Sequence, residues 1–313
     1  MLVLKYLRIR LFQMIPVLFG ILVMVFSMVR LIPGDPARIM LGTHASPERL
    51  AELRAELGLE APIGHQFRLF IVSVFEGNLG VSLVYRRPVL DVIYERLPPT
   101  LSLVAYAAAL SLLITIPLAL WASVCKDGPV DHGIRILSTI TLSMPSFWLG
   151  LILLILFAVR IPLFPVAGYG NNFLDHLWHL FLPSLTIMLM LAPMLIRSLR
   201  SGLIDVLKAP HVEFARAKGI SEGHVLWWHV LRNALISTVT VLGLNIGWLI
   251  GGTVVIETVF TIAGLGSLMV SSIYARDYLV IQSVTLVFAL LVISINFATD
   301  VVYAMLDPRV SYD

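Results

Sequence analysis

Charged residues and cysteines are scarce in this sequence. Only 13% of its 313 residues are charged, 58% are hydrophobic, and the mean hydropathy is +0.93. Soluble domains carry about 25% charged and about 45–50% apolar residues, so the composition excludes an ordinary soluble domain. The single cysteine, Cys125, cannot form an internal disulfide, and it therefore carries no information about the redox compartment.

Motifs for metal, nucleotide or nucleic-acid binding are also missing. The chain has no C-x-x-C, no H-E-x-x-H and no Cys/His cluster with metal-ligand spacing. A P-loop requires a lysine after a glycine, and none of the four lysines follows one: Lys5, Lys126, Lys208 and Lys218. A net charge of +3 is too small to indicate nucleic-acid binding. We therefore expect no metal, no cofactor and no catalytic nucleotide site in this chain.

Long apolar runs are abundant instead. A membrane-spanning helix needs about 20 apolar residues, and six segments qualify: Leu11–Ile32, Thr100–Val124, Ile134–Ile161, Leu180–Leu199, Leu235–Val259 and Val280–Leu306. The first run is longer than the apolar core of a signal peptide, which predicts an uncleaved span. The sequence therefore predicts an all-α, polytopic membrane protein with one transmembrane domain over residues 1–313. Pro145 and Pro193 predict kinks in the third and fourth spans.

The distribution of Lys and Arg predicts the orientation. With a cytoplasmic N-terminus, 12 of the 22 basic residues lie inside and 10 outside. Eight of the ten outside lie between Arg30 and Arg96, in or beside a loop of about 67 residues, and such long loops cross largely regardless of charge. The two short outside loops hold only Arg160 and Arg276. We expect six spans with both termini in the cytoplasm.

The segment between the first two spans, Pro33–Pro99, is expected to form a small helical cap on the outside. Apolar residues at helical spacing predict a helix over Pro47–Leu57, with Ser46 as N-cap and Gly58 as the residue after its end. A second helix is expected over His65–Phe75.

A polar cytoplasmic segment, Ile204–Asn233, separates the fourth and fifth spans. Val212–Lys218 is predicted to be helical, because basic residues and then Gly219 mark its end. Ser221 offers an N-cap for a second helix over Glu222–Asn233. Phe214 beside small residues suits docking into a groove of another protein. The basic residues and the Trp227–Trp228 pair equally suit a helix lying on lipid headgroups, and these residues alone do not decide between the two.

Charged and polar residues in or near the spans are candidates for function, since they are costly in a membrane. Arg197 and Arg200 either snorkel to the inner interface or support the polar segment. Glu257 is expected to pair with Arg276, with Asp277 competing for that arginine, an arrangement that would shape an outer gate. Asn245 either bonds a neighbouring helix or contacts a transport pathway.

Small and polar residues repeat along the fifth and sixth spans. The glycines recur at helical spacing and indicate either close helix packing or room along a pathway: Gly243, Gly247, Gly251 and Gly252. Asn296 and Asp300 share one face of the sixth span and are expected to contact a neighbour's polar group. His224 and His229 have no third ligand in sight, so we do not expect a metal site there.

A series of short motifs along the chain resembles the permease subunits of ABC importers of the peptide/nickel family. The N-terminal half carries Leu31–Ala37 (LIPGDPA), Leu53–Leu59, Gly77–Ser82, Arg87–Val89, Arg96–Pro98 and Pro145–Gly150. The C-terminal half carries Ala215–Gly219 (ARAKG), Leu231–Ile236, Glu257–Phe260, Gly264–Gly266, Arg276–Tyr278 and Leu306–Arg309. Each motif alone is weak, but their order on six spans is specific.

The resemblance implies a role for the polar segment as the coupling helix that docks on an ATPase. Glu213, Ala215 and Gly219 fall where the coupling motif of these importers has its Glu, second Ala and Gly. Phe214 replaces the first Ala, and Arg232 stands where the wider superfamily has Pro. Two further positions differ from the residues that are usual in the peptide/nickel family. Ser237 stands where this family usually has Pro, and Ile262–Ala263 stand where it usually has Trp-Pro. The implied coupling residues are Glu213, Phe214, Ala215, Arg216, Ala217, Lys218 and Gly219, and the candidate pathway or gate residues are Asn245, Gly247, Gly251, Glu257, Arg276 and Asp277.

The resemblance also implies partners and a substrate class. We expect a homologous second permease, two cytoplasmic ATPases that bind ATP and Mg²⁺, and an extracytoplasmic substrate-binding protein. Di- or oligopeptides are the expected cargo, with glutathione, nickel complexes or a sugar as alternatives. An intramembrane hydrolase is a remote alternative, because Gly264–Leu268 does not match G-x-S-x-G. A passive channel is another.

Overall fold

The computed structural model describes residues 2–31, 36–41, 46–56, 58 and 60–306. Within these residues the regular structure is helical, apart from an isolated β-bridge between Val81 and Pro88. The expected all-α class is therefore confirmed. Several expectations lie partly outside the described residues: the end of the first span at Ile32, the start of the cap at Pro33, the end of the expected helix at Leu57, and parts of the motifs at residues 31–37, 53–59 and 306–309.

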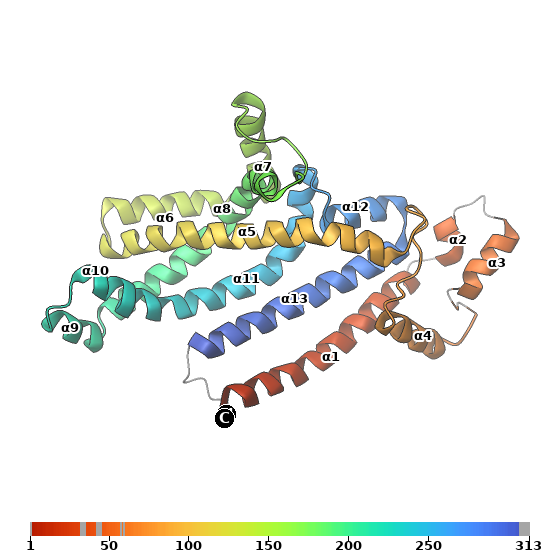
Figure 1. Ribbon diagram of the computed structural model, residues 1–313, viewed down its shortest axis with the longest axis horizontal. Coiled ribbons are helices and arrows are strands. Elements are labelled where there is room, and N and C mark those ends of the chain that lie inside the picture. Colours follow the sequence, from red (N-terminus) through yellow and green to blue (C-terminus); the bar gives the residue numbers. More distant parts are fainter. Residues whose placement is uncertain (1, 32–35, 42–45, 57, 59, 307–313) are drawn as a thin grey trace.

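The long helices run roughly side by side along the long axis of the molecule (Figure 1). Four of them are long and apolar enough to cross a membrane, and the number rises to six if each of two bent helix pairs counts as one span. The count of six stays a prediction that depends on these two bent pairs. The four are α1 (Leu2–Arg30), α5 (Val89–Val124), α8 (Phe173–Leu207) and α13 (Tyr278–Leu306).

The third expected span is broken at Pro145. Its first part is α6 (Pro129–Leu142), and its second is α7 (Ser146–Leu154) followed by the π-helix η1 (Ile155–Arg160). The two parts are bent by 103°, and α7 stands away from the other helices in Figure 1. Proline has no amide hydrogen, and it also disfavours helical geometry in the residue before it. At Pro193, by contrast, α8 continues without interruption.

The fifth span is joined directly to the cytoplasmic segment. The short helix α10 (Glu222–His224) continues through the π-helix η2 (Val225–Leu231) into α11 (Arg232–Val259). The helix expected over Glu222–Asn233 is present as α10, η2 and the first residues of α11. The stretch Glu222–Leu235 is bent by 43° relative to Thr238–Gly247, and these two stretches are the second bent pair. The turn after α9 (Pro210–Ala217) is the only break between α9 and α11.

Two features at the end of the molecule that carries α2 to α4 differ from expectation. The helix α5 already begins at Val89, inside the range 33–99 that was expected to form the external cap, and it continues through Pro98 and Pro99. A further helix, α12 (Leu265–Ala275), lies between α11 and α13. The sequence analysis missed α12 because its apolar residues are too few for a span and carry no clear helical stripe.

The cap contains α2 (Pro36–Leu41), α3 (Pro47–Glu56) and α4 (Ile63–Phe75). The expected N-cap of α3 is confirmed, because the backbone N–H of Arg49 donates to Ser46 Oγ at 3.2 Å. Gly58 adopts a positive φ of 62° after α3, as the expected end signal requires. The helix α4 packs on the outer end of α1, where the Phe26 and Phe67 rings lie 5.1 Å apart.

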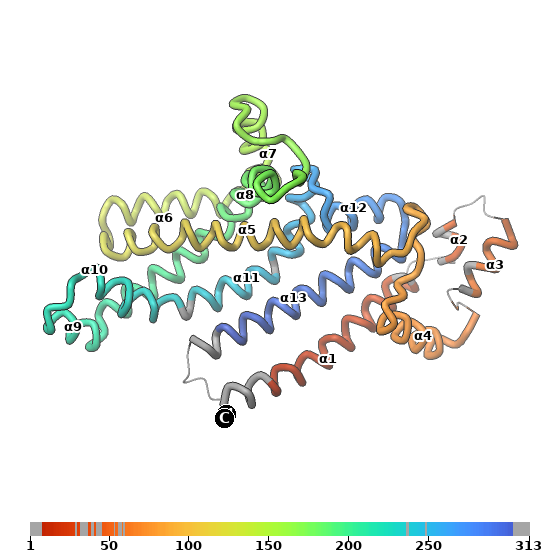
Figure 2. Tube along the Cα trace, viewed as in Figure 1, coloured from red at the N-terminus to blue at the C-terminus, as the bar shows by residue number. Residues whose placement is uncertain are grey.

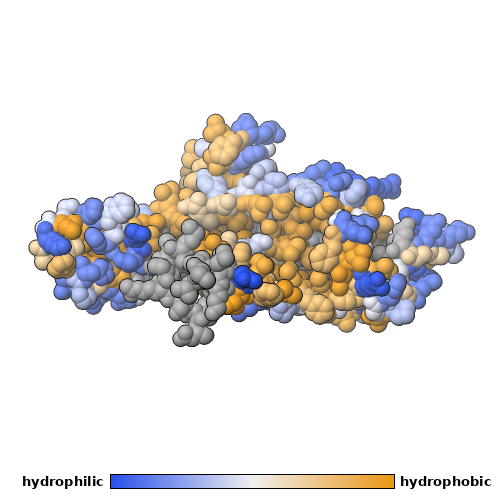
Figure 3. Space-filling model, turned by 60° about the horizontal axis from the view of Figure 1, so that its bottom comes forward, coloured by the Kyte–Doolittle hydropathy of each residue, from blue (hydrophilic) through white to orange (hydrophobic). Residues whose placement is uncertain are grey.

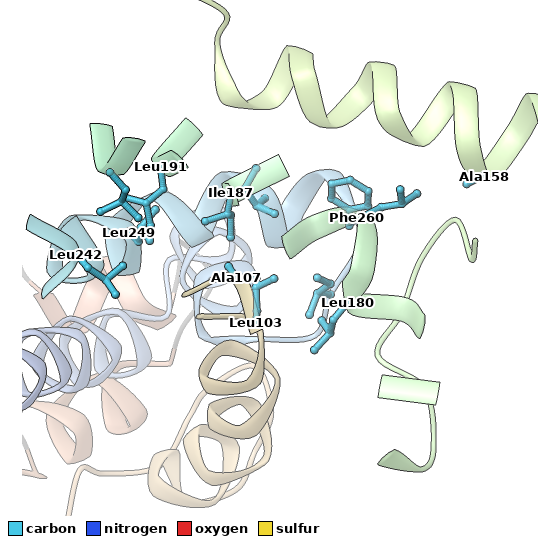
Figure 4. Packing of buried hydrophobic residues seen from close by; sticks show 13 residues of the cluster. Leu103, Ala107, Ala158, Leu180, Ile187, Leu191, Leu242, Leu249 and Phe260 are labelled. Carbon is cyan, nitrogen blue, oxygen red and sulfur yellow. The ribbon is translucent and has the colours of Figure 1, made fainter. Parts of the chain in front are cut away.

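The largest buried cluster lies where α5, α8 and α11 meet (Figure 4). Its labelled members are Leu103, Ala107, Ala158, Leu180, Ile187, Leu191, Leu242, Leu249 and Phe260. A second cluster lies between α8, α9 and η2, and a third joins the start of α5 to α12 and α13. In a membrane such contacts stabilise mainly by close packing.

The surface is divided in the way a membrane requires. The middle of the face shown in Figure 3 is largely hydrophobic, whereas hydrophilic residues gather at its two ends. The tube in Figure 2 shows α1 beside α13, and the N-terminal part of α1 is joined to the C-terminal part of α13 by an ion pair between Arg10 and Asp300 at 3.2 Å. The expected polar contact of Asp300 is thereby confirmed.

Candidate functional site: the coupling segment and the outer polar cluster

The helix α9 and the following turn lie at one end of the molecule, opposite the cap (Figure 1). Only Lys208 and Ala209 separate α9 from α8, and Pro210 occupies the first turn of α9, a position that suits proline. The chain then turns at Gly219 with φ of 78°. A Cβ on Gly219 would meet no atom within 4 Å, so glycine is required here by the backbone conformation and not by space.

Six of the seven predicted coupling residues are exposed: Glu213, Phe214, Arg216, Ala217, Lys218 and Gly219. Ala215 is different, with an exposed fraction of 5%. It packs with Val212 in the cluster between α8, α9 and η2. The small side chain of Ala215 therefore lets α9 lie close against its own chain, and its expected part in the coupling contact stays a prediction.

The exposed side of α9 presents one aromatic side chain among charges. Phe214 is 62% exposed, and Lys218 Nζ lies 4.5 Å from the centre of its ring. Arg216 donates from Nε and Nη2 to the two carboxylate oxygens of Glu222, at 2.9 and 3.2 Å. This pair spans the Gly219 turn and holds α9 against α10, although an exposed pair contributes only about 0–1 kcal/mol.

The residues behind the turn face outward from η2. Trp227 and Trp228 are 59% and 62% exposed, which agrees with a position at the membrane surface. His224 and His229 have rings 6.1 Å apart. Among the described residues no group of three or more His, Cys, Asp or Glu is placed to hold a metal ion.

Glu257 is fully buried near the C-terminal end of α11. Thr100 of α5 donates its hydroxyl to Glu257 Oε1 at 2.6 Å, and the backbone N–H of Ser267 donates to Oε2 at 2.9 Å. The carboxylate therefore lies at the N-terminus of α12 and accepts a hydrogen bond from its first turn, where free N–H groups and the helix dipole favour a negative charge. The expected pair between Glu257 and Arg276 is not formed, because α12 separates them and Arg276 is exposed at its far end.

Two glycines make room for this carboxylate. A Cβ on Gly264 would lie 2.5 Å from the carboxyl carbon of Glu257. One on Gly266 would lie 2.5 Å from the Cα of Val254. The motifs at residues 257–260 and 264–266 are thus one structural unit, in which α12 approaches α11 too closely for any side chain at these two positions.

Asp277 lies at the other end of α12 and is also buried. Ser82 donates its hydroxyl to Asp277 Oδ2 at 2.5 Å, and the backbone N–H of Val84 donates to the same oxygen at 3.3 Å. Asp277 therefore fixes the external loop before α5. Asp277 was expected to compete with Glu257 for Arg276, and it does not.

The remaining pathway candidates do not form one lining. Asn245 donates to the carbonyl of Val241 in its own helix at 2.7 Å. A Cβ on Gly247 would touch Val292 and Asn296 of α13 at 3.4 and 3.5 Å, whereas Gly251 is exposed with nothing within 4 Å. Gly247 therefore serves helix packing, whereas a Cβ on Gly251 or on its neighbour Gly252 would meet no atom within 4 Å.

The sequence analysis missed a buried ion pair near the inner end. Arg200 of α8 donates from Nε and Nη2 to the carboxylate of Asp131, at 2.6 and 2.5 Å. Asp131 has an exposed side-chain fraction of 0% and Arg200 of 18%. Arg200 therefore does not snorkel, whereas Arg197 is exposed. The only sequence signal was an aspartate close to the start of an apolar run.

Comparison with known families matches nearly the whole chain. Residues 115–312 match the family described as "Binding-protein-dependent transport system inner membrane component". Residues 3–104 match the N-terminal family of the same kind of membrane component.

Curated relatives match over their full length. A putative peptide transport system permease protein of Brucella abortus (strain 2308) is 40% identical over 308 residues, covering 97% of this chain and 98% of the relative. The glutathione transport system permease protein GsiC of Escherichia coli (strain K12) is 39% identical over 309 residues, covering 99% of each.

Among solved structures, the inward-facing MetNI methionine ABC transporter has a similar chain. The TM-score is 0.58 at 18% identity, covering 70% of this chain and 97% of that one. At this identity the likeness shows a shared fold.

Proposed function

The chain belongs to the family of binding-protein-dependent transport system inner membrane components, and we propose that it forms half of the membrane pathway of an ATP-driven importer for di- or oligopeptides. The family is that of multi-pass ABC permease subunits, which work with separate ATPases. The observation that carries the proposal is the 40% identity over 97% of the chain to a putative peptide permease.

Glutathione is the second candidate cargo, because relatives at 39% identity are glutathione permeases. Glutathione is itself a tripeptide, so both candidates share amide bonds and free carboxylates. Nickel complexes and sugars remain expectations of the resemblance alone. Competition between labelled glutathione and unlabelled tripeptides for uptake would separate the candidates.

The exposed residues of α9 are proposed to dock on an ATPase subunit. Phe214 offers a large apolar side chain that is not packed on its own chain, and aromatic residues often dominate binding energy when they enter a pocket. The charges of Glu213, Arg216 and Lys218 surround it and would form the polar rim of the contact. ATP and Mg²⁺ would bind to the ATPases, and this chain would bind no cofactor.

The orientation follows from this assignment. If α9 meets a cytoplasmic ATPase, the cap at the opposite end of the molecule faces outward (Figure 1). The pair between Arg10 and Asp300 holds the inner ends of α1 and α13 together, which supports both termini on the cytoplasmic side. The cap is then positioned to meet a substrate-binding protein.

One chain is proposed to pair with a homologous permease around the pathway. The protruding α7 and η1 carry exposed apolar residues: Phe147, Trp148, Leu151, Ile155 and Val159. Closure of the ATPases on ATP would displace α9 and, through it, the spans. The pathway would then open alternately to either side by rigid-body rocking.

Substitution at the Gly219 turn tests the coupling role. Gly219→Asp places a side chain and a negative charge on a residue at positive φ, a backbone conformation that residues other than glycine disfavour, and so disturbs the turn after α9. We expect loss of ATPase assembly on the membrane and loss of uptake. Gly223→Asp is the matched control, since Gly223 is also exposed with open space around it but lacks the positive φ. Normal assembly and uptake with Gly219→Asp would refute the role.

A further inference from the structure

The ion pair between Asp131 and Arg200 joins two helices that are otherwise connected by few buried groups. Among all residues of α6, only Asp131 and Thr141 are buried. The outer face of α6 is exposed, with Ile136 and Leu137 each 60% accessible. The position of α6 therefore depends on a polar contact more than on apolar packing.

The contact fixes orientation as well as distance. Two nitrogens of one planar guanidinium meet the two oxygens of one carboxylate, a fork that holds both groups in a defined plane. Asp131 Oδ2 also accepts the backbone N–H of Asp127 at 3.0 Å. The turn between α5 and α6 is thereby part of the same unit.

Arg200 belongs to the helix that carries the coupling segment. The helix α8 ends at Leu207, and α9 starts at Pro210 after two residues. Leu199 and Leu203 of α8 pack in one cluster with Val212 of α9. A displacement of α9 is therefore passed to the inner end of α8, next to Arg200.

We propose that the Asp131–Arg200 pair is the positioning link through which the inner end of α8 moves α6 and the broken span beyond it. The inference rests on the proposed coupling role of α9. It adds that α6 follows α8 as one body, because the paired charges supplement the few apolar contacts of α6, such as that of Ile134 with the cluster of Leu199 and Leu203. Neither residue touches cargo or nucleotide in this assignment.

The test measures the distance between α6 and α8 in the purified complex with its ATPases. Spin labels are placed at Leu137 on α6 and at Arg197 on α8, both exposed, in a Cys125→Ser background. We expect the same narrow distance distribution without nucleotide and with ATP plus vanadate. In the apolar double variant Asp131→Leu/Arg200→Met, the distribution should broaden or shift in the vanadate state, and uptake per ATP should fall roughly tenfold.

Two further variants separate linkage from folding. Arg200→Lys keeps the charge but loses the fork, and we expect an intermediate fall in uptake per ATP. Arg197→Gln, one turn away on α8, is the control for unlabelled uptake and should behave as wild type. An unchanged α6–α8 distance and unchanged uptake per ATP in the double variant would overturn the proposal. Failure of both Arg200→Lys and the double variant to assemble with the ATPases would also overturn it, in favour of a purely structural role.

The outcome is distinguishable from failure of the coupling role itself. If α9 does not couple, Gly219→Asp transports normally, whatever happens at Asp131. If α9 couples but the link does not exist, Gly219→Asp fails while the Asp131/Arg200 double variant transports as wild type.

Discussion

Gly264 illustrates how strongly one buried carboxylate constrains its neighbours. A Cβ at this position would lie 2.5 Å from the carboxyl group of Glu257. We predict that Gly264→Ala destabilises the protein by about 1–3 kcal/mol, because the overlap forces α12 away from α11. The midpoint of thermal aggregation in detergent would measure this loss.

Gly252 provides the matched control for Gly264. It lies in α11, and a Cβ there would meet nothing within 4 Å. Gly252→Ala should therefore leave stability unchanged or raise it by about 0.5–1 kcal/mol, since alanine favours a helix. Equal destabilisation by both substitutions would contradict the account of the Glu257 site.

Phe214 is the residue predicted to contribute most to ATPase binding. Its ring is 62% exposed, so Phe214→Ala should not unfold α9. Removing an aromatic anchor costs about 2 kcal/mol or more of binding free energy, which corresponds to a loss of at least about 30-fold in affinity. Titration of the solubilised permease with purified ATPase would measure it.

Phe75 is the control for that titration. It is 82% exposed, but it lies at the end of α4 in the cap. Phe75→Ala should leave ATPase affinity unchanged. If Phe214→Ala binds as tightly as wild type, α9 does not dock through its exposed aromatic side chain.

At the scale of elements, α12 is held at both ends by buried acids. Glu257 accepts a hydrogen bond from the first turn of α12. Asp277, just after the last turn, accepts hydrogen bonds from Ser82 and Val84 of the loop before α5. The third cluster adds apolar contacts between α12, α13 and the start of α5. These contacts join the elements into one packed unit, which we expect to move as a body.

The external loop offers a test of this unit. Asp277→Ala removes the acceptor of Ser82 and Val84, so the loop should detach and trypsin should cleave more readily after the exposed Arg86. We expect cleavage about tenfold faster, corresponding to about 1.4 kcal/mol less protection. Asp205→Ala, an exposed acid on the inner side, controls for loss of charge, and equal cleavage in both variants would disprove the tie.

Elements with local signals were predictable from the sequence, and contacts between distant residues were not. Ser46, Pro47 and Gly58 mark the ends of α3 within one short stretch, and the structure agrees. The partners of Glu257 and Arg200 lie 157 and 69 residues away. No spacing rule reaches so far, so the wrong partner was predicted for Glu257 and none was predicted for Arg200.

The coupling segment shows both sides of this limit. The turn at Gly219 was predictable, because basic residues and glycine end helices for local reasons. The burial of Ala215 was not, because it depends on how α9 packs against α8 and η2. The break at Pro145 was expected only as a kink, since its size depends on which neighbours support the chain.

At the scale of the whole molecule, two ends are built for different contacts. One end presents the exposed face of α9, and the opposite end carries the cap and the α12 unit, with an apolar middle between them (Figures 1 and 3). These features fit the proposed permease subunit, in which an ATPase docks at the α9 end and a binding protein delivers substrate at the cap end. We therefore expect that transport through this chain requires ATP hydrolysis by partner ATPases.

The most direct test reconstitutes the purified complex with its binding protein in proteoliposomes. Uptake of a labelled tripeptide and of labelled glutathione is measured with ATP and with a non-hydrolysable ATP analogue. The account predicts uptake of at least one of the two probes that requires ATP and is abolished by the analogue. The account would be contradicted if either probe were taken up at the same rate without ATP hydrolysis. It would also be contradicted if neither probe showed ATP-dependent uptake.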